Sequence, residues 1–394
     1  MRPMNTPSAI AHYIGNDDIF SIRKNFRFFN HAGVSPLPKP VATALRKFAD
    51  EAESFAYIGM DWWKDQDALR GVAAKFINAD ASEITLVKNT SEGISLVAQG
   101  LDWKAGDRIV TTAVEYPANV YPWMNVQKRF GVELVMVPEE TDPATGARHV
   151  PADKIIAAID EKPTKLVTLS HVEYASGQRH DLARIGAHCR AKGVLLNIDA
   201  IQSLGVVPVD VKAMNIDFLA ADGHKWMLGP EGAGICYVRR ELLDTLRPMM
   251  FGATSVINPM EFGNYDFTLK PDATRYESGS NPMPGLLALK AAIELLMDAG
   301  IDNISQRVKS LGDRVIAGVT AKGYRVVSPR TNDQWSGIVS FVAPDPAMHK
   351  DIANKLRSDH KIEIAIREGR LRASAHFYNT EDEIDALIEA LPVG

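Results

Sequence analysis

The feature that most constrains the fold is a regular alternation of short apolar runs and helical patterns between Ile84 and Val238. The runs are too continuously apolar for strands with one exposed face, so helices should cover both faces of the sheet. Strands are expected at 84–87, 108–112, 132–137, 166–170, 194–199, 217–220 and 234–238, and helices at 91–99, 121–129, 151–160 and 182–192. This alternation predicts an α/β domain with a mostly parallel sheet.

The composition changes after this region. Residues 251–281 are rich in Gly, Asn and Pro with weak periodicity, and a strong helical pattern follows at 285–299. Beyond it, helical patterns at 304–322, 350–359 and 381–391 and strand patterns at 324–327, 338–342 and 362–366 indicate an α+β unit. We therefore expect an N-terminal arm (1–20), a large domain (21–280) and a smaller C-terminal domain (281–394).

Overall composition excludes several classes of protein. The net charge of -5 and the absence of a lysine cluster interleaved with aromatic residues argue against nucleic acid as a partner. The two cysteines, Cys189 and Cys236, give neither a disulfide framework nor the spacing of zinc ligands, so no metal is expected. No stretch resembles a secretion signal or a membrane span. The sequence predicts a cytoplasmic protein that does not cross a membrane.

Two charged residues stand in settings where charge is costly. Asp199 ends a very apolar run, so its carboxylate should either cap the following helix or meet a cation. Lys225 lies 26 residues later, before a glycine-rich stretch. Burial would lower its pKa and so favour the neutral amine, which is the form that makes a Schiff base. Pyridoxal phosphate (PLP) needs this pair: an amine to carry it and a carboxylate to keep its ring nitrogen protonated. A helix cap at Asp199 and a surface position for Lys225 are the alternatives.

A third signal lies after the first expected strand, where Asn89-Thr90-Ser91-Glu92-Gly93 opens a helix. Its hydroxyls and free backbone N–H groups suit a phosphate. An ordinary helix cap explains the same residues equally well.

Several segments together resemble the class V aminotransferase family of PLP enzymes, which includes cysteine desulfurases, isopenicillin N epimerase-like proteins and, more distantly, kynureninases. The resemblance covers nearly the whole chain, and the segments that carry it are 30–38, 199–203, 222–226, 229–234, 275–280 and 371–380. It implies the fold type I architecture, PLP as cofactor, an amino-acid substrate and a homodimer whose active sites are shared between subunits.

The resemblance also assigns roles at the reacting end of the site. Lys225 would carry the internal aldimine and move the α-proton, while Asp199 would pair with the ring nitrogen. Gln202 would hydrogen-bond the phenolic oxygen of the cofactor. Arg372 would bind the α-carboxylate of the substrate, a task suited to the bidentate guanidinium, and Ala32 would also line the substrate site.

Other residues would hold the rest of the cofactor. Thr90, Ser91 and His224 would bind the phosphate, and Ser280 would reach it from the partner subunit. Tyr116 takes the position of a histidine that stacks on the ring in cysteine desulfurases, and tyrosine can still stack.

The chain departs from the desulfurase pattern at three further points. Asp222 replaces a phosphate-binding serine and should repel a phosphate unless it turns toward another donor, so it is not assigned to the phosphate. Tyr174 replaces an asparagine near the cofactor oxygen, and its role is left open. The small domain also lacks the nucleophilic cysteine on a mobile loop that persulfide-forming desulfurases need. Cys189 falls in an expected helix and Cys236 in an expected strand, positions typical of structural thiols.

Loss of the α-proton is therefore the expected first step, and an aminotransferase-like enzyme is the predicted function. Elimination of a β-substituent by a C–S lyase and epimerisation or racemisation are the alternatives within the family. A ligand-binding module without catalysis is the alternative from another class.

Overall fold

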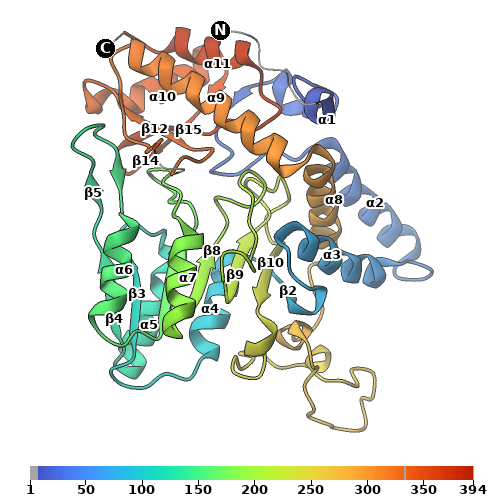
Figure 1. The fold of residues 1–394 in the computed structure, drawn as a ribbon. Helices are drawn as coiled ribbons and strands as arrows, with labels where there is room; N and C mark the ends of the chain where they lie inside the picture. The colour runs from blue at the N-terminus through green and yellow to red at the C-terminus, as the bar shows by residue number, and fades with distance from the viewer. Residues whose placement is uncertain (1–7, 332–333, 394) are drawn as a thin grey trace.

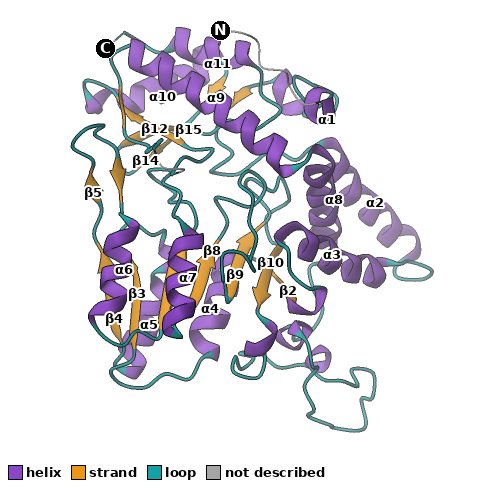
Figure 2. Cartoon of the chain, in the orientation of Figure 1, coloured by secondary structure: helices purple, strands orange, loops and turns teal. Residues whose placement is uncertain are grey.

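The structure, a computed structural model, describes residues 8–331 and 334–393. Residues 1–7 of the expected N-terminal arm lie outside the described residues. A seven-stranded sheet forms the centre of the larger part of the molecule, and a four-stranded sheet forms the smaller part (Figures 1 and 2). In sheet order the central strands are β2 (Ile84–Val87), β10 (Gly234–Val238), β9 (Phe218–Asp222), β8 (Leu195–Asp199), β7 (Leu166–Ser170), β3 (Arg108–Thr112) and β4 (Glu133–Val137).

The central sheet is mostly parallel. Pairs β9–β8, β8–β7, β7–β3 and β3–β4 are parallel, and β10 runs antiparallel to both of its neighbours. The expected mostly parallel α/β sheet is thus confirmed.

Helices cover both faces of this sheet. Helices α6 (Ala152–Glu161) and α7 (Leu182–Lys192) pack together on one face, and α4 (Thr90–Gly100) and α5 (Tyr121–Phe130) pack together on the other (Figure 1). Neighbouring residues of one strand enter different cores: Val110 packs with the first helix pair, and Ile109 packs with the second. Strands buried on both faces explain the continuous apolar runs of the sequence.

The smaller part contains the four-stranded sheet and three helices. Its strand order is β11 (Arg325–Val326), β12 (Val339–Val342), β15 (Arg370–Ala373) and β14 (Ala365–Arg367), all antiparallel. Its helices are α9 (Ile301–Ala321), α10 (His349–His360) and α11 (Glu381–Ala390). The N-terminal segment joins this part, because β1 (Arg27–Phe28) pairs with β13 (Ile362–Glu363) and Phe29 lies in the same core.

The remaining elements flank these two sheets. Helix α8 (Met283–Ala299) packs against α2 (Lys39–Phe55), α3 (Trp62–Ile77) and α9, while α1 (Ser8–Ala11) contacts α8 and α9. Strands β5 (Glu140–Thr141) and β6 (Arg148–His149) form a separate hairpin.

The sequence-based expectation was wrong at one strand and incomplete elsewhere. The single strand expected at 362–366 is divided into β13 and β14, which belong to different sheets. Strand β15 and helices α2 and α3 were not expected. Helix α2 begins directly after Pro38 and buries only Val41 completely, so its apolar stripe is narrow.

The described helices include none that is long and apolar enough to cross a bilayer. Among the described residues there is also no cluster of three or more His, Cys, Asp or Glu side chains that is arranged to hold a metal ion.

Candidate active site

A cavity of about 560 Å³ lies beyond the carboxyl ends of the parallel strands, where ligands bind in open α/β sheets. Strands β8 and β9 end at Asp199 and Asp222 beside it, and helix α4 begins there. Its lining combines nine of the ten site residues predicted from the sequence, namely Ala32, Thr90, Ser91, Tyr116, Asp199, Gln202, His224, Lys225 and Arg372.

Lys225 reaches the cavity through a tight turn that follows β9. The N–H of Gly223 donates to Ala233 O at 2.8 Å, and Gly223 O accepts from the Gly229 N–H at 2.8 Å. A Cβ atom at Gly223 would lie 2.7 Å from Leu289 Cδ1 and 2.9 Å from Ala233 O. Glycine is required at this position because any side chain would force apart the backbone that holds Lys225.

The Lys225 amine lies at the cavity wall in a poorly solvated setting. Its pKa is lowered from 10.5 to about 8, mainly by burial and to a smaller extent by the positive charge of Arg372, whereas the Asp199 carboxylate acts in the opposite direction. Lys225 Nζ also lies 5.6 Å from the centre of the Tyr116 ring. A substantial fraction of this amine is therefore neutral at slightly alkaline pH and able to add to a carbonyl group.

Asp199 is 2% exposed and lies at the end of β8. Its Oδ1 accepts the Ile201 N–H at 3.0 Å, so the helix-cap alternative is partly correct, although the following residues form turns rather than a helix. Burial raises the pKa of Asp199 to about 6, with the Ile201 N–H and Lys225 acting against that rise. A buried carboxylate with one backbone donor is suited to a cationic partner in the cavity.

Gln202 is fixed from both ends of its amide. Trp226 Nε1 donates to Gln202 Oε1 at 2.9 Å, and Gln202 Nε2 donates to Ala32 O at 3.1 Å. Ala32 N in turn donates to Ser374 Oγ at 3.1 Å, so both backbone groups of Ala32 are engaged within the protein. The second hydrogen of Gln202 Nε2 remains available at the cavity wall.

The start of helix α4 also lines the cavity. The Asn89 side chain caps this helix by accepting the Glu92 N–H at 2.9 Å. Thr90 Oγ1 accepts the Asp222 N–H at 3.0 Å, which leaves its own hydroxyl proton free to donate. The helix N-terminus and the Thr90 and Ser91 side chains together suit an anion.

The carboxylate of Asp222, whose role the sequence left open, lies beside the ring of His224. Its Oδ2 lies 3.0 Å from His224 Nδ1, and its Oδ1 has no partner among the described residues. His224 Nδ1 likewise has no hydrogen-bond partner among the described residues, so the two side chains are close without a hydrogen bond, and both line the cavity.

Arg372 is 1% exposed, yet none of its described partners is a carboxylate. Its Nη1 donates to Tyr174 O at 2.8 Å, and its Nη2 lies 3.4 Å from Asn30 Oδ1, while Nε has no partner among the described residues. Burial, followed by the nearby Arg367, lowers the pKa of Arg372 to about 9, so the guanidinium is still charged at neutral pH. Such a cation is prepared to bind a carboxylate.

Among the polar lining residues, Asn30 and Arg367 had been given no role from the sequence. Asn30 belongs to a segment that had already been recognised, but without a role of its own. Arg367 precedes the two-residue turn Glu368–Gly369, and this Glu-Gly pair between apolar runs is the signal that predicts a hairpin here. Tyr174, whose role the sequence left open, packs edge-on against Tyr116 and donates from its hydroxyl to Glu368 Oε1 at 2.8 Å.

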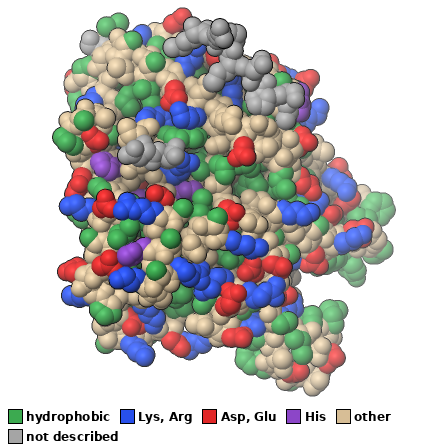
Figure 3. Space-filling model, in the orientation of Figure 1, with side chains coloured by type: hydrophobic (Ala, Val, Ile, Leu, Met, Phe, Trp, Pro, Cys, Tyr) green, Lys and Arg blue, Asp and Glu red, His purple; other side chains and the backbone are tan. Residues whose placement is uncertain are grey.

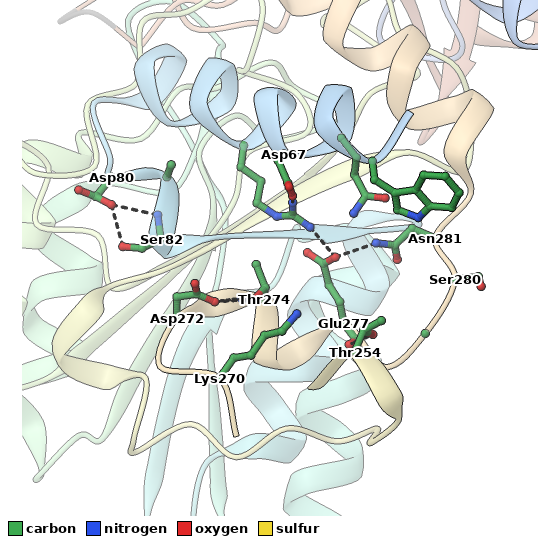
Figure 4. Close-up of a pocket in the computed structure, with 15 residues that line it drawn as sticks. Asp67, Asp80, Ser82, Thr254, Lys270, Asp272, Thr274, Glu277, Ser280 and Asn281 are labelled. Atoms are coloured by element: carbon green, nitrogen blue, oxygen red, sulfur yellow. Dashed lines mark hydrogen bonds and ion pairs between the residues drawn. The ribbon is translucent and has the colours of Figure 1, made fainter. Parts of the chain in front are cut away.

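Ser280 lies apart from the other predicted residues. It lines a separate cavity of about 760 Å³ together with residues of α3 and the segment before α8 (Figure 4). Glu277 anchors that segment by accepting from Arg70 Nη2 at 2.6 Å and from Asn281 Nδ2 at 2.7 Å. Within one chain, Ser280 is not a lining residue of the cavity that contains Lys225.

Neither cysteine lines the Lys225 cavity. Cys189 lies in α7 and Cys236 in β10, and both are buried. Burial raises the pKa of each thiol to about 12, so neither is a ready nucleophile at neutral pH. The structural interpretation of both thiols is consistent with these positions.

The side chains of the cavity fit PLP. The Lys225 amine, whose pKa is lowered, lies in the same cavity as the buried Asp199 carboxylate. The Oδ2 atom of this carboxylate has no hydrogen-bond partner among the described residues. A helix N-terminus with two hydroxyl side chains also lines this cavity. These groups match the aldehyde, the ring nitrogen and the phosphate of the cofactor.

Comparison with known proteins decides the family, because the class V aminotransferase profile matches residues 27–387. The chain belongs to the class V aminotransferase family. It is accordingly a PLP-dependent enzyme of fold type I.

Two class V relatives show the extent of the sequence similarity. A probable cysteine desulfurase of Pyrococcus abyssi is 33% identical over 383 residues, covering 92% of this chain and 93% of the relative. A cysteine desulfurase of Cronobacter sakazakii is 30% identical over 387 residues and 92% of both chains.

Solved class V structures agree with this assignment. An apo cysteine desulfurase from Thermococcus onnurineus superposes with a TM-score of 0.83 at 28% identity, over 95% of this chain and 98% of that one. The cystine C–S lyase C-DES, in complex with its reaction product cysteine persulfide, gives a TM-score of 0.83 at 26% identity, over 93% and 97%.

Proposed function

We propose that this enzyme is a C–S lyase that removes the α-proton of a sulfur-substituted amino acid and expels the sulfur group from the β-carbon. The observation that carries the proposal is the turn between Arg367 and Arg370. The turn contains two residues, Glu368 and Gly369, both with positive φ of 46° and 68°, as in a type I′ hairpin. This tight hairpin leaves no room for a cysteine-bearing loop beside Arg372, so sulfur would leave the enzyme rather than remain on it.

The names of the similar proteins support carbon–sulfur chemistry. The relatives above are named cysteine desulfurases, and C-DES is named a cystine C–S lyase. For a substrate R–S–CH2–CH(NH3⁺)–COO⁻, uptake of one water overall yields R–SH, pyruvate and ammonium. Carbon, sulfur and electrons balance in this reaction without an oxidant or a reductant.

Each residue at the reacting end has a proposed task. When bound, PLP supplies an electron-withdrawing ring that accepts the electron pair of the broken Cα–H bond. Lys225 takes the proton from Cα, because its lowered pKa makes the free amine an effective base near neutral pH. Asp199 holds the proton of the cofactor ring nitrogen, and Gln202 donates to the phenolic oxygen. Arg372 orients the substrate through its α-carboxylate, with Ala32 beside it.

The remaining contacts hold the cofactor in place. Thr90, Ser91 and His224 bind the phosphate at the start of α4, and Tyr116 lies against the ring. Tyr116 is held by its edge-on contact with Tyr174 at 5.2 Å between ring centres.

Transamination, which the sequence predicts, begins with the same proton transfer, and so does epimerisation. Transamination and epimerisation differ from each other in the atom that receives the proton from Lys225. Both differ from the lyase reaction in that no sulfur group leaves the β-carbon. The test is to incubate the holoenzyme with L-cystine, with alanine plus a keto acid, and with single enantiomers of several amino acids. Pyruvate with ammonium from cystine supports the lyase, whereas a new amino acid or inverted stereochemistry contradicts it.

The Lys225→Ala variant tests whether the protein is an enzyme at all. Loss of the α-proton base should lower turnover by about 10²–10⁴-fold. Equal spectra and equal inactivity toward every amino acid for wild type and variant would instead indicate a ligand-binding module.

We also propose a homodimer in which Ser280 reaches the cofactor phosphate of the partner subunit. Ser280 is exposed in the single chain, and the nearby loop that projects at the lower right of Figure 1 carries strongly exposed apolar side chains. Met260 is 75% exposed, Phe262 71% and Tyr265 96%, and hydrophobic atoms gather on this lobe in Figure 3. Exposed apolar surface of this kind is typical of an interface. The free cysteines support a cytoplasmic location.

A further inference from the structure

Three arginines share one face of the β14–β15 hairpin. Ala365 lies opposite Arg372 and Arg367 lies opposite Arg370, and residues directly opposite each other in an antiparallel pair point to the same face. Because residues two apart along a strand also share a face, the side chains of Arg367, Arg370 and Arg372 project together.

These arginines differ in whether a carboxylate lies within ion-pair distance and in whether they line the cavity. Arg370 Nη2 lies 3.5 Å from Glu139 Oε2 and does not line the Lys225 cavity. Arg367 and Arg372 do line that cavity, and within residues 8–331 and 334–393 neither forms an ion pair with a carboxylate. The described contact of Arg367 is from Nη1 to Ile366 O at 2.8 Å, which leaves most of its guanidinium donors unused.

The acidic groups nearest to Arg367 have other partners. Glu368, its neighbour in the turn, accepts from the Tyr174 hydroxyl. Asp199 also lines the cavity, and the cation that acts on its carboxylate is Lys225. Two uncompensated cations in one partly desolvated cavity repel each other, and each gains when an anion enters.

An ordinary α-amino acid brings one carboxylate and therefore satisfies one of the two arginines. We propose that Arg367 binds a second carboxylate, so that the preferred substrate carries one on the far side of its sulfur atom in addition to its α-carboxylate. This inference rests on the proposed C–S lyase function and specifies its substrate class as disulfide-linked or thioether-linked amino acids with a distal carboxylate. Arg367 is thus a specificity-determining residue.

The test compares two thioethers that differ in one group. S-(2-carboxyethyl)-L-cysteine carries a distal carboxylate, and S-propyl-L-cysteine carries a methyl group in its place. Dissociation constants are measured from the change in visible absorbance of the holoenzyme, and kcat and KM from pyruvate release. Arg367→Ala should weaken binding of the carboxylate ligand by about ten- to a hundredfold, because a charge-assisted hydrogen bond is lost. Binding of the propyl ligand should change by less than about twofold.

Arg370→Ala is the matched control, since it removes an arginine from the same face that lies outside the Lys225 cavity and within 3.5 Å of the Glu139 carboxylate, which Arg148 also contacts. It should leave the preference between the two ligands unchanged. Equal weakening of both ligands by Arg367→Ala would indicate a structural role and overturn the inference, as would an unchanged affinity for the carboxylate ligand.

The binding data separate this inference from the proposed function. If wild type binds both thioethers with the expected preference but releases no pyruvate, the lyase proposal fails and the role of Arg367 stands. If pyruvate forms from both thioethers at similar kcat/KM, and Arg367→Ala changes neither of these values, the proposed role of Arg367 fails and the lyase proposal stands.

Discussion

The indole N–H of Trp226 donates to Gln202 Oε1 at 2.9 Å, and this contact decides which end of the Gln202 amide faces the cavity. With its oxygen engaged, Gln202 presents Nε2, the donor that we propose for the phenolic oxygen of PLP. Trp226 follows Lys225 directly, so one turn positions both the reacting amine and the indole that orients Gln202.

Trp226→Phe should therefore weaken PLP retention by about fivefold, because a net hydrogen bond contributes about 1 kcal/mol. Gln202→Leu should have a similar effect. In the double variant the two losses should not add, since Trp226 acts through Gln202. Fully additive losses, measured by equilibrium dialysis of PLP, would contradict this relationship. Thermal unfolding of each variant controls for the loss of packing at the buried Trp226.

The pH dependence of cofactor attachment tests the environment of Lys225. Only the neutral amine adds to the aldehyde, so covalent attachment to the apoprotein should rise with pH around a midpoint near 8. Borohydride reduction at timed intervals measures it. A midpoint near 10.4, the value of an ordinary lysine, would show that Lys225 is solvated.

Asp199→Asn provides the companion measurement. The Asp199 carboxylate raises the pKa of Lys225, so its removal should move the midpoint of attachment to lower pH. The same variant should reduce turnover by about a hundredfold or more, because it removes preorganised charge from beside the cofactor ring. A shift of the attachment midpoint to higher pH would contradict the interaction between Asp199 and Lys225.

Subunit mixing tests the role of Ser280. In a hybrid dimer of Lys225→Ala and Ser280→Ala chains, one site has Lys225 from one chain and Ser280 from the other. If Ser280 acts across the interface, each hybrid dimer should have about half of the activity of a wild-type dimer, because one of its two sites is intact. No recovery, despite hybrid dimers detected by mass spectrometry, would place the action of Ser280 within its own chain or exclude it.

The residues at the centre of the site were predictable because their settings are local. Asp199 ends a continuous apolar run, and Lys225 follows the next strand before a glycine-rich stretch, so both were expected at the carboxyl edge of a parallel sheet. The resemblance to a family then supplied Gln202 and Arg372, which no local pattern distinguishes from ordinary polar residues.

Other features depend on contacts that are distant in the sequence. The role of Arg367 follows from the register of β14 against β15 and from the absence of a partner such as Glu139, neither of which a linear pattern reveals. The division of 362–366 into two strands arises because β13 pairs with β1, more than 300 residues earlier. The placement of Ser280 depends on a second chain, so it stays a prediction.

The most direct test of the proposed function follows the sulfur. Wild type and a Cys189→Ala/Cys236→Ala variant are incubated with L-cystine, and pyruvate, ammonium and the sulfur product are quantified together with protein-bound persulfide. We predict one pyruvate and one ammonium per sulfur product released, no persulfide on the protein, and rates for the two proteins within about twofold, since neither thiol lines the cavity. Persulfide on Cys189 or Cys236, or activity that disappears in a variant that still folds, would contradict the account.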